Sequence, residues 1–516
     1  MSDFRRVKRV MAALTVGLAA FAFSGVQVSA ASAAENERSY TYNQAGTPVY
    51  TPDTYNYKGA VDLTDGTLSA ASPQDLFVAQ TGELFIADTD NNRILIFDKD
   101  FQFERAVLRI TDENGQVSLL NKPEGIYVYP DGDLLISDTQ NNRLVRCDRE
   151  GNAKAIFGRP DLAGVSQDDA FLPIKAVCDS LGRIDVVARN IHYGIVQLDA
   201  DGTFLSYIGA PKVQPDPFTL FWRQFSTKEQ EKQMLQFIST EYSNLYIDEK
   251  DFMWGTIKTL DNDALLNAVA SRDKSGGVTP IKKLNSMGKD ILKRNGTFAP
   301  LGDLKVASSG TDTAPSRIID VALRGDGAVY SLLDITRGHI FTYDSNGNLL
   351  YIFGGYGLRK SNFQIPTAFS YIGDDLAVLD AGLGKILLFT PTAYVKLLFQ
   401  AVDLQYNGDF TEANALWSRI AAENTNFDYA FVGLGKAEMN GGQYAEAMES
   451  FKYADSVSNY SNAFTLLRTQ KMKVYFPIVF GVILAGIASV ILYSRVKRLV
   501  KRLRKRSAGG GIADGS

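Results

Sequence analysis

The sequence predicts a mainly β protein built from repeated antiparallel sheets, followed by a short helical segment and one membrane-spanning helix. Three observations lead to this prediction. A stretch of 17 residues recurs in related form fifty residues further along the chain. Near residue 394 the spacing of apolar residues changes from two to about 3.6, which is the change from strand to helix. An uncharged apolar run of 21 residues then lies close to the C-terminus.

The repeated stretch covers residues 82–98 and 132–148. Each copy holds two short runs of β-branched and aromatic residues, such as Leu84–Ala87 and Ile94–Phe97, separated by a polar segment, Asp88–Asn92 in the first copy. Asn and Asp accept left-handed backbone and bond to neighbouring N–H groups, so this polar segment suits a tight turn. Further strands are expected before and after each copy. Four antiparallel strands in a period of about 40–50 residues are typical of one blade of a β-propeller.

The pattern continues in weaker form along the β region. Pro173 keeps the fifty-residue spacing, a divergent unit covers 244–295, and two later units keep the five-residue spacing between an Asp and a basic residue. We therefore expect six blades over residues 73–393. The recurring structural positions are Asp88 and Arg93, Asp138 and Arg143, Asp334 and His339, and Asp380 and Lys385. In the third unit, Arg189 and Gly194 are predicted to replace this pair.

The sixth unit ends without an outer strand, at the point where the helical spacing begins. Within the N-terminal segment 34–72, Tyr55–Val61 has the composition of a strand and is predicted to supply the missing one. This pairing would close the ring, which matters because an open propeller would expose a sheet edge.

The motif Pro-x-x-Leu/Ile…Asp-Gly-x-Leu…Asp-Thr-x-Asn-Asn-Arg-Ile resembles the NHL repeat, most clearly in the first two units. The resemblance implies a six-bladed NHL-type propeller, whose role is scaffolding or recognition more often than catalysis. Similar propellers that act as sugar-lactone hydrolases or amidating lyases place metal ligands at one mouth, but those ligands do not map onto this sequence. We therefore predict no catalytic residues, no cofactor and no metal. A metal-dependent lactonase or lyase-like ectoenzyme is the alternative.

Segment 394–470 carries a second repeat, with a period of 34 residues. Asn407–Ala413 is matched by Gly441–Ala447, and the packing positions are Phe410, Ala413 and Trp417 in one copy and Tyr444, Ala447 and Phe451 in the other. This resembles the tetratricopeptide repeat (TPR), in which small residues let two helices approach and large ones fill the groove. Two interpretations stay open, a partner-binding surface and a stalk that sets the height of the propeller. A further helix over 459–469 either caps the repeats or continues into the span.

Both ends of the chain carry targeting signals. Residues 1–33 hold four basic residues, an apolar run over Val10–Phe23 and small residues beyond it, which is typical of a secretory signal peptide. An uncleaved anchor is the alternative. The run Val474–Ser494 is long enough for a transmembrane helix, with Pro477 expected in its first turn. Eight basic residues in 495–516 predict a cytoplasmic C-terminus, and so a single-pass cell-membrane protein with its N-terminal part outside.

Composition limits the partners. Without the terminal segments 1–33 and 495–516, the chain has 42 basic and 56 acidic residues, a net charge near −14. This part is not expected to bind nucleic acid. Cys147 and Cys178 fall on strands that are not neighbours in one blade, so buried free thiols are expected rather than a disulfide. The expected partners are the membrane, a protein of an envelope complex such as a transport complex, and a small-molecule or glycan ligand.

Residues that break the symmetry of the repeat are the candidates for binding. Glu124 stands at the start of a first strand, where it would line one mouth of the tunnel, and Arg189 and Asn190 depart from the turn pattern. In the insertion 211–241, Phe221 and Trp222 belong to an apolar helical stripe, which fits a lid, a docking element or plain packing on the propeller. The polar insertion 261–279 is predicted to be a mobile loop.

Overall fold

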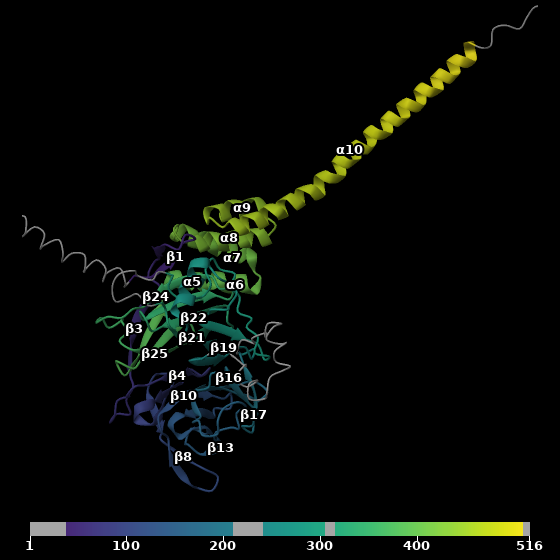
Figure 1. Cartoon of the computed structure of the whole chain (residues 1–516). Helices are drawn as coiled ribbons and strands as arrows, with labels where there is room; N and C mark the ends of the chain where they lie inside the picture. Colours follow the sequence, from purple (N-terminus) through teal and green to yellow (C-terminus); the bar gives the residue numbers. More distant parts are fainter. Residues whose placement is uncertain (1–37, 210–240, 305–314, 509–516) are drawn as a thin grey trace, which may run out of the picture. The chain divides into compact units, whose positions relative to one another are not determined.

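The computed structural model of the chain describes residues 38–209, 241–304 and 315–508. These residues form a six-bladed β-propeller followed by a helical region that ends in one long apolar helix (Figure 1). The predicted fold class is confirmed at this level. The predicted signal peptide, and Phe221 and Trp222 of the insertion, lie outside the described residues.

Each of the first three blades is a four-stranded antiparallel sheet whose strands follow one another along the chain. The first blade contains β4 (Asp75–Val78), β5 (Leu84–Asp88), β6 (Arg93–Phe97) and β7 (Phe103–Val107). The second contains β10 (Pro123–Val128), β11 (Leu134–Asp138), β12 (Arg143–Cys147) and β13 (Ala153–Phe157). The third contains β14 (Leu172–Cys178), β15 (Ile184–Arg189), β16 (Ile195–Leu198) and β17 (Phe204–Ile208). The first strand of each blade is innermost, because β4, β10 and β14 contact one another in turn.

The last three blades are less regular. The fourth has three strands, β18 (Asn244–Ile247), β19 (Met253–Thr256) and β20 (Ile281–Leu284). The fifth contains β21 (Ile318–Arg324), β22 (Val329–Asp334), β23 (His339–Asp344) and β24 (Leu349–Phe353), and the N-terminal strands β1 (Tyr40–Tyr42) and β2 (Pro48–Tyr50) extend its outer edge. The sixth contains β25 (Pro366–Ile372), β26 (Asp375–Asp380), β27 (Lys385–Pro391) and, as its outer strand, β3 (Tyr55–Asp62). A separate hairpin, β8 (Arg109–Thr111) and β9 (Val117–Leu119), joins the first two blades.

The core lies between neighbouring blades. Ile94 and Ile96 of the first blade pack with Ile126 and Ile136 of the second, and all four side chains are fully buried. Burying one such side chain contributes about 1.5–3 kcal/mol. Every second residue of a strand faces one neighbouring blade, and the residues between them face the other, so the strands read as nearly continuous apolar runs.

The recurring Asp fixes the turn between the second and third strands of a blade. Asp88 is fully buried; its Oδ1 accepts the N–H of Ala71 at 2.7 Å and its Oδ2 accepts Nε of Arg93 at 2.6 Å. Asp138 makes the equivalent bonds, to Asn121 at 2.8 Å and to Arg143 at 2.7 Å. The carboxylate therefore ties the turn to the segment that leads into the first strand of the same blade.

The basic partner of this Asp is less constant. Asp334 and Asp380 also accept a backbone N–H from the segment before the first strand. His339, however, faces Asp303, with Nδ1 3.8 Å from the carboxylate, and Lys385 pairs with Asp62 at 2.8 Å. In the four blades that have this Asp it keeps its role, while the residue five positions later does not.

In the third blade the predicted substitution was wrong by one residue. Pro123 pairs with Asp138 in the second blade, and Pro173 pairs with Ala188 in the third. Ala188 therefore occupies the Asp position, and Tyr193 stands fifty residues after Arg143. The third blade has no carboxylate in this turn, and Arg189 is free for another role.

The prediction of a mobile loop over 261–279 was wrong for its first half. This part forms α5 (Asn262–Ser271), whose first turn is capped by Asp261, with the carboxylate accepting the N–H of Ala264 at 2.7 Å. Leu265 and Ala268 are buried against Ala299 and Leu301. Two apolar residues on one face and a good N-cap are enough to order a short helix once the propeller offers them a surface.

Helices begin directly after the last blade. Thr392 caps α6 (Ala393–Asn407), and α6 packs against α7 (Phe410–Glu423). Ala413 and Trp417 of α7 are fully buried, and Nε1 of Trp417 donates to Gln405 at 2.9 Å. Phe410 is half-buried.

The chain divides into two compact units, residues 1–430 and 431–516. The helix α8 (Asp428–Asn440) crosses this boundary, and α9 (Tyr444–Tyr453) and α10 (Val457–Ala508) follow it. Ala447 and Phe451 are fully buried and Tyr444 is half-buried, as are their counterparts 34 residues earlier. A Cβ on Gly435 would lie 2.7 Å from the ring of Phe451, so glycine lets α8 and α9 approach.

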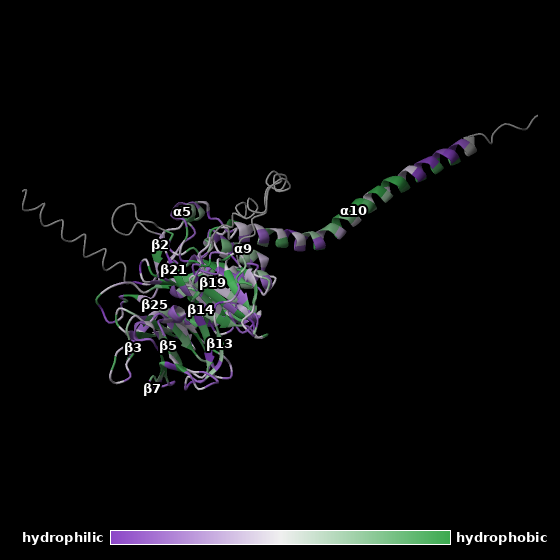
Figure 2. Ribbon diagram, turned by 60° about the horizontal axis from the view of Figure 1, so that its bottom comes forward, coloured by the Kyte–Doolittle hydropathy of each residue, from purple (hydrophilic) through white to green (hydrophobic). Residues whose placement is uncertain are grey.

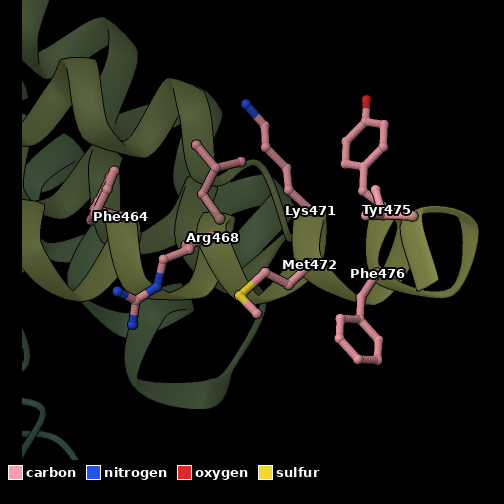
Figure 3. A pocket seen from close by; sticks show the side chains of 8 residues that line it. Phe464, Arg468, Lys471, Met472, Tyr475 and Phe476 are labelled. Carbon is pink, nitrogen blue, oxygen red and sulfur yellow. The ribbon is translucent and has the colours of Figure 1, made fainter. Parts of the chain in front are cut away.

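The last helix is continuous from Val457 to Ala508, so Pro477 lies inside it and not in its first turn. Figure 2 shows the middle of α10 in the hydrophobic colour between hydrophilic ends. By length and composition it is able to cross a membrane, and its most apolar stretch is not buried. Its side chains also line a groove of about 390 Å³ (Figure 3). The lining residues are Phe464, Leu467, Arg468, Lys471, Met472, Tyr475, Phe476 and Val479.

We expect Asp138→Ala to lower the free energy of unfolding by about 3–5 kcal/mol, because three part-buried donors lose a fully buried acceptor. Lys385→Ala removes the basic residue of the sixth blade, whose partner Asp62 is exposed, and should cost at most about 1 kcal/mol. Urea unfolding of the full chain in detergent, followed by tryptophan fluorescence, measures both. Equal losses for the two variants would contradict the architectural role of the recurring Asp.

Candidate binding site at the propeller mouth

The two ends of the propeller differ. One end, called the mouth here, is where the innermost strands begin. At the other end, Nη1 of Arg324, the last residue of β21, donates to both carboxylate oxygens of Asp403 in α6 at 2.9 Å, and Nε donates to Asp374 at 2.6 Å. The guanidinium also lies over the ring of Phe399 at 4.4 Å. The helices α6 and α7 therefore belong to the end opposite the mouth.

One register position of each innermost strand faces the axis of the ring. Strand pairing aligns each of these residues with the same position of the second strand in its blade. In chain order the six residues are Asp75, Gly125, Lys175, Asn244, Asp320 and Ala368. The repeat is thus symmetric in backbone but not in chemistry at the axis.

These residues form a buried polar network. Lys175 donates to the carboxylate of Asp75, two blades away, and to the carbonyl of Ile126 at 3.1 Å. Asp320 accepts Nδ2 of Asn244 at 2.7 Å and the N–H of Phe369 at 2.8 Å. Burial raises the pKa of Asp320 to about 7, opposed by the N–H of Phe369 and the charge of Lys175. At this level the axis therefore carries buried charged and amide side chains that pair with one another.

Gly125 makes the contact between Lys175 and Asp75 possible. A Cβ at this position would lie 2.4 Å from the carbonyl oxygen of Ile174 and 3.0 Å from Cα of Lys175. Only glycine lets the second and third blades approach this closely. Without a side chain in the second blade, the Lys175 side chain reaches across it to the first.

At the mouth, Arg189 and Glu124 meet as an ion pair. Nη2 of Arg189 donates to Oε2 of Glu124 at 2.6 Å, from the end of β15 to the start of β10. Burial raises the pKa of Glu124, and the charge of Arg189 opposes this shift. Half of the Arg189 side chain is exposed. Two of the predicted binding residues are therefore brought together.

In the first two blades, the position equivalent to Arg189 holds a threonine that hydrogen-bonds to the next blade. Thr89 donates to the carbonyl of Pro123 in the next blade at 2.7 Å, and Thr139 donates to that of Pro173 at 2.7 Å. The strand register places Arg189 at the same position in the third blade and Lys258 in the fourth. The third and fourth blades thus have a basic side chain where the first two have this threonine.

Lys258 and Arg317 belong to the same end of the ring. Lys258 follows β19 and Arg317 directly precedes β21, where both strands meet the mouth. Burial lowers the pKa of Lys258, and the positive charges of Arg317 and Arg189 lower it further. Sequence reasoning missed both residues. Lys258 was detectable as the residue that replaces Thr139 in the register, but that register is visible only once the fourth blade is aligned by its strand pairs.

Asn190 has a backbone role. Its φ is 71°, in the left-handed region that Asn tolerates, and it follows β15 in the turn where the first two blades form a short 3-10 helix, η1 (Thr89–Asn91) and η2 (Thr139–Asn141). In that turn, Nδ1 of His192 lies 2.8 Å from Glu241. Among the described residues, no three His, Cys, Asp or Glu side chains gather in a way that could hold a metal ion.

A second polar cluster ties the N-terminus to the fifth blade. Tyr42 donates to Asp303, and the hydroxyl of Tyr40 lies 3.3 Å from Nδ1 of His339. Burial lowers the pKa of His339, while the carboxylate of Asp303 opposes this shift. Asp303 and His339 are buried, and the two tyrosines are half-buried. The cluster therefore fastens β1 to the blade.

The third blade also buries an acid. Asp185 accepts Nε2 of Gln197 at 3.0 Å through Oδ1, while Oδ2 has no hydrogen-bond partner among the described residues. Burial raises the pKa of Asp185 to about 7, opposed by the bond from Gln197 and assisted by the charge of Asp179. Cys147 and Cys178 are free and buried, as predicted.

The fold and the mouth define a β-propeller with one end that carries exposed charged side chains and one end joined to helices. No protein-family model and no curated protein matches the chain. Among solved structures, the chain is similar to virginiamycin B lyase from Staphylococcus aureus, with 13% identity, a TM-score of 0.38 and coverage of 65% of this chain and 99% of that one.

It is also similar to the β-propeller domain of Cps50 (Swd1) from Myceliophteria thermophila, with 10% identity, a TM-score of 0.38 and coverage of 66% and 100%. For hydrazine synthase from Kuenenia stuttgartiensis the identity is 12%, the TM-score 0.37 and the coverage 66% and 99%. Likenesses at this level do not indicate what the mouth binds.

Gly125→Ala should lower the free energy of unfolding by about 1–3 kcal/mol, because the new methyl group meets backbone atoms that cannot move aside. Gly158→Ala is the matched control, since a Cβ there has no atom within 4 Å and should be neutral or stabilising by up to about 1 kcal/mol. Urea unfolding of both variants checks the sign. A harmless Gly125→Ala would show that the two blades do not approach as described.

Stability should depend on the titration of Asp185. Its pKa is raised from 3.8 to about 7 in the folded protein, so its contribution is complete below pH 4 and is lost as the pH rises through 7. Asp185→Asn mimics the neutral acid. Between pH 5 and 8 the wild type should lose on the order of 2–4 kcal/mol relative to this variant. Parallel pH profiles for wild type and Asp185→Asn would refute this expectation, and Asp168→Asn, at an exposed site, serves as control.

Proposed function

We propose that this chain is a membrane-anchored, extracytoplasmic binding or scaffold protein of an envelope complex. The observation that supports the proposal is the difference between the two ends of the propeller. The mouth presents the charged side chains of Glu124, Arg189, Lys258 and Arg317, whereas α6 is fixed to the opposite end by Arg324. A ligand and a protein partner would thus use different surfaces.

We infer that the blades are of the NHL type. Asp88 and Asp138 make the same pair of bonds within a repeated Asp-Thr-x-Asn-Asn-Arg turn, and Thr89 and Thr139 reach the same carbonyl of the next blade. A motif whose side chains repeat their contacts serves the architecture, so recognition falls to the residues that depart from it.

We infer likewise that α6–α9 are TPR-like helices that carry the protein partner. The equivalent residues 34 positions apart are buried to the same degree, with Ala413 and Ala447 fully buried and Phe410 and Tyr444 half-buried. Tyr429, at the start of α8, donates to Asp344 of the fifth blade and accepts Nδ2 of Asn348 at 3.1 Å. Such buried bonds hold the first helices firmly enough to present a surface in a fixed direction.

The membrane attachment rests on α10 and the two chain ends. The apolar stretch of α10 is bordered on its C-terminal side by a run of basic residues, which favours a cytoplasmic tail. With the predicted signal peptide at 1–33, we infer that the propeller lies outside the cytoplasm. A transport complex of the envelope is the partner class that this arrangement fits best in our proposal.

Fractionation and protease protection test the proposal. The full chain should stay in carbonate-washed membranes, and a chain ending at residue 470 should be soluble outside the cytoplasm, because only the former keeps the apolar stretch of α10. Protease added to intact cells should digest the propeller and spare an epitope placed after residue 508. Digestion of the tail with a protected propeller would contradict the proposed orientation.

Recognition is tested in the same cells by photo-crosslinking. A crosslinking residue at Leu358, fully exposed in the loop that enters the sixth blade at the mouth, or at the exposed Tyr453 of α9 should give discrete adducts. Leu181, exposed at the far end of the third blade, is the control position. If all three positions gave the same adducts or none, the chain would have no specific recognition surface at the mouth or on the helices.

A further inference from the structure

Three basic residues from consecutive blades lie at the mouth ends of their strands. Arg189 is the last residue of β15, Lys258 lies two residues after β19, and Arg317 directly precedes β21. The innermost strands of these blades, β14, β18 and β21, contact one another in turn. The three cations therefore lie on adjoining segments at the same end of the ring.

Several other basic residues at the mouth have carboxylate partners. Arg93 and Arg143 pair with buried Asp88 and Asp138, and Lys122 lies 3.4 Å from Asp90. Lys385 pairs with Asp62. Paired cations of this kind contribute to the turns and leave little charge for a ligand.

The group of Arg189, Lys258 and Arg317 is different. Among the described residues, Glu124 is the only carboxylate that pairs with this group, through Arg189, and neither Lys258 nor Arg317 makes an ion pair. Lys258 is half-buried, and its ammonium group is close enough to both arginines for their charges to disfavour its protonated form. Three positive charges with a single carboxylate between them cost free energy unless a further anion offsets the excess.

The donors of this group indicate which kind of anion would bind. Two guanidinium groups offer planar pairs of N–H donors and Lys258 offers a compact ammonium, a set that matches the oxygens of a carboxylate or a phosphate. Below the mouth, Lys175 and Asp75 are buried and paired with each other, so their charges are not available to a ligand. The ligand must bind at the entrance through one charged group.

We propose that the mouth binds one oxyanion group of a small-molecule ligand, a carboxylate or a phosphate, between Arg189, Lys258 and Arg317. The inference rests on the proposed function, because it names the ligand class of the same recognition surface. Arg189 would exchange its bond to Glu124 for the ligand, and Glu124 would limit affinity by competing for it.

Titration calorimetry on the full chain in detergent tests this, with inorganic phosphate and succinate as the two probes. At least one probe should bind, and Lys258→Met and Arg317→Ala should each weaken its binding about tenfold, the loss of one charge-assisted hydrogen bond. Glu124→Gln should strengthen binding several-fold, because Arg189 loses its competitor. The probe that binds more tightly identifies phosphate or carboxylate as the preferred group.

Lys289→Met is the matched control, because Lys289 is an exposed lysine of the same blade at the end opposite the mouth. It should bind like the wild type. Failure of both probes to bind, or equal affinity in Lys258→Met and Lys289→Met, would overturn the inference. Arg317 is exposed, so its variant tests binding even where Lys258→Met unfolds. Crosslinking at the mouth and membrane anchoring would still stand in that case, so the two proposals fail separately.

Discussion

The pairing of β3 with β27 is the constraint on which the rest of the molecule depends. Residues 55–62 come from the start of the propeller and residues 385–391 from its end, and their hydrogen bonds close the ring. The same junction starts the helical region. Thr392 follows β27 directly, donates its N–H to the carbonyl of Thr54 at 2.9 Å and caps α6. Closing the propeller therefore also sets the direction in which the helices leave it.

A closed ring brings side chains together that share no spacing in the sequence. Lys175 reaches Asp75 because Gly125 of the intervening blade has no side chain, and Asp320 feels the charge of Asp75 across Ala368. Around the axis, uncharged residues alternate with charged ones. In this way an architecture built by repetition acquires one unsymmetrical centre, and burial raises the pKa of one of its acids to about 7.

The sequence predicted the parts of the fold that depend on local pattern. The turn at Asp88 was predictable because its Asp, Asn and Arg bond within a few residues of one another. The pair of strands at the N-terminus, β1 and β2, and the helix α5 were not, since both are ordered by surfaces that the finished propeller offers. At the mouth, Glu124 and Arg189 were found by their departure from the repeat. Lys258 and Arg317 were missed, because the fourth blade matches the motif poorly and only the closed ring brings these residues near Arg189.

A single strand, β21, runs from one end of the propeller to the other. β21 has Arg317 directly before it at the mouth, Asp320 on the axis and Arg324 at the end that binds α6. Seven residues in a strand span roughly 23 Å, and this strand is paired along its length with β22. Its hydrogen bonds and its buried neighbours hold it in one arrangement, and a coupling between sites needs an element with two. The strand is thus better suited to hold the mouth and α6 at a fixed distance than to pass a signal between them. A fixed distance is what the proposed scaffold role requires.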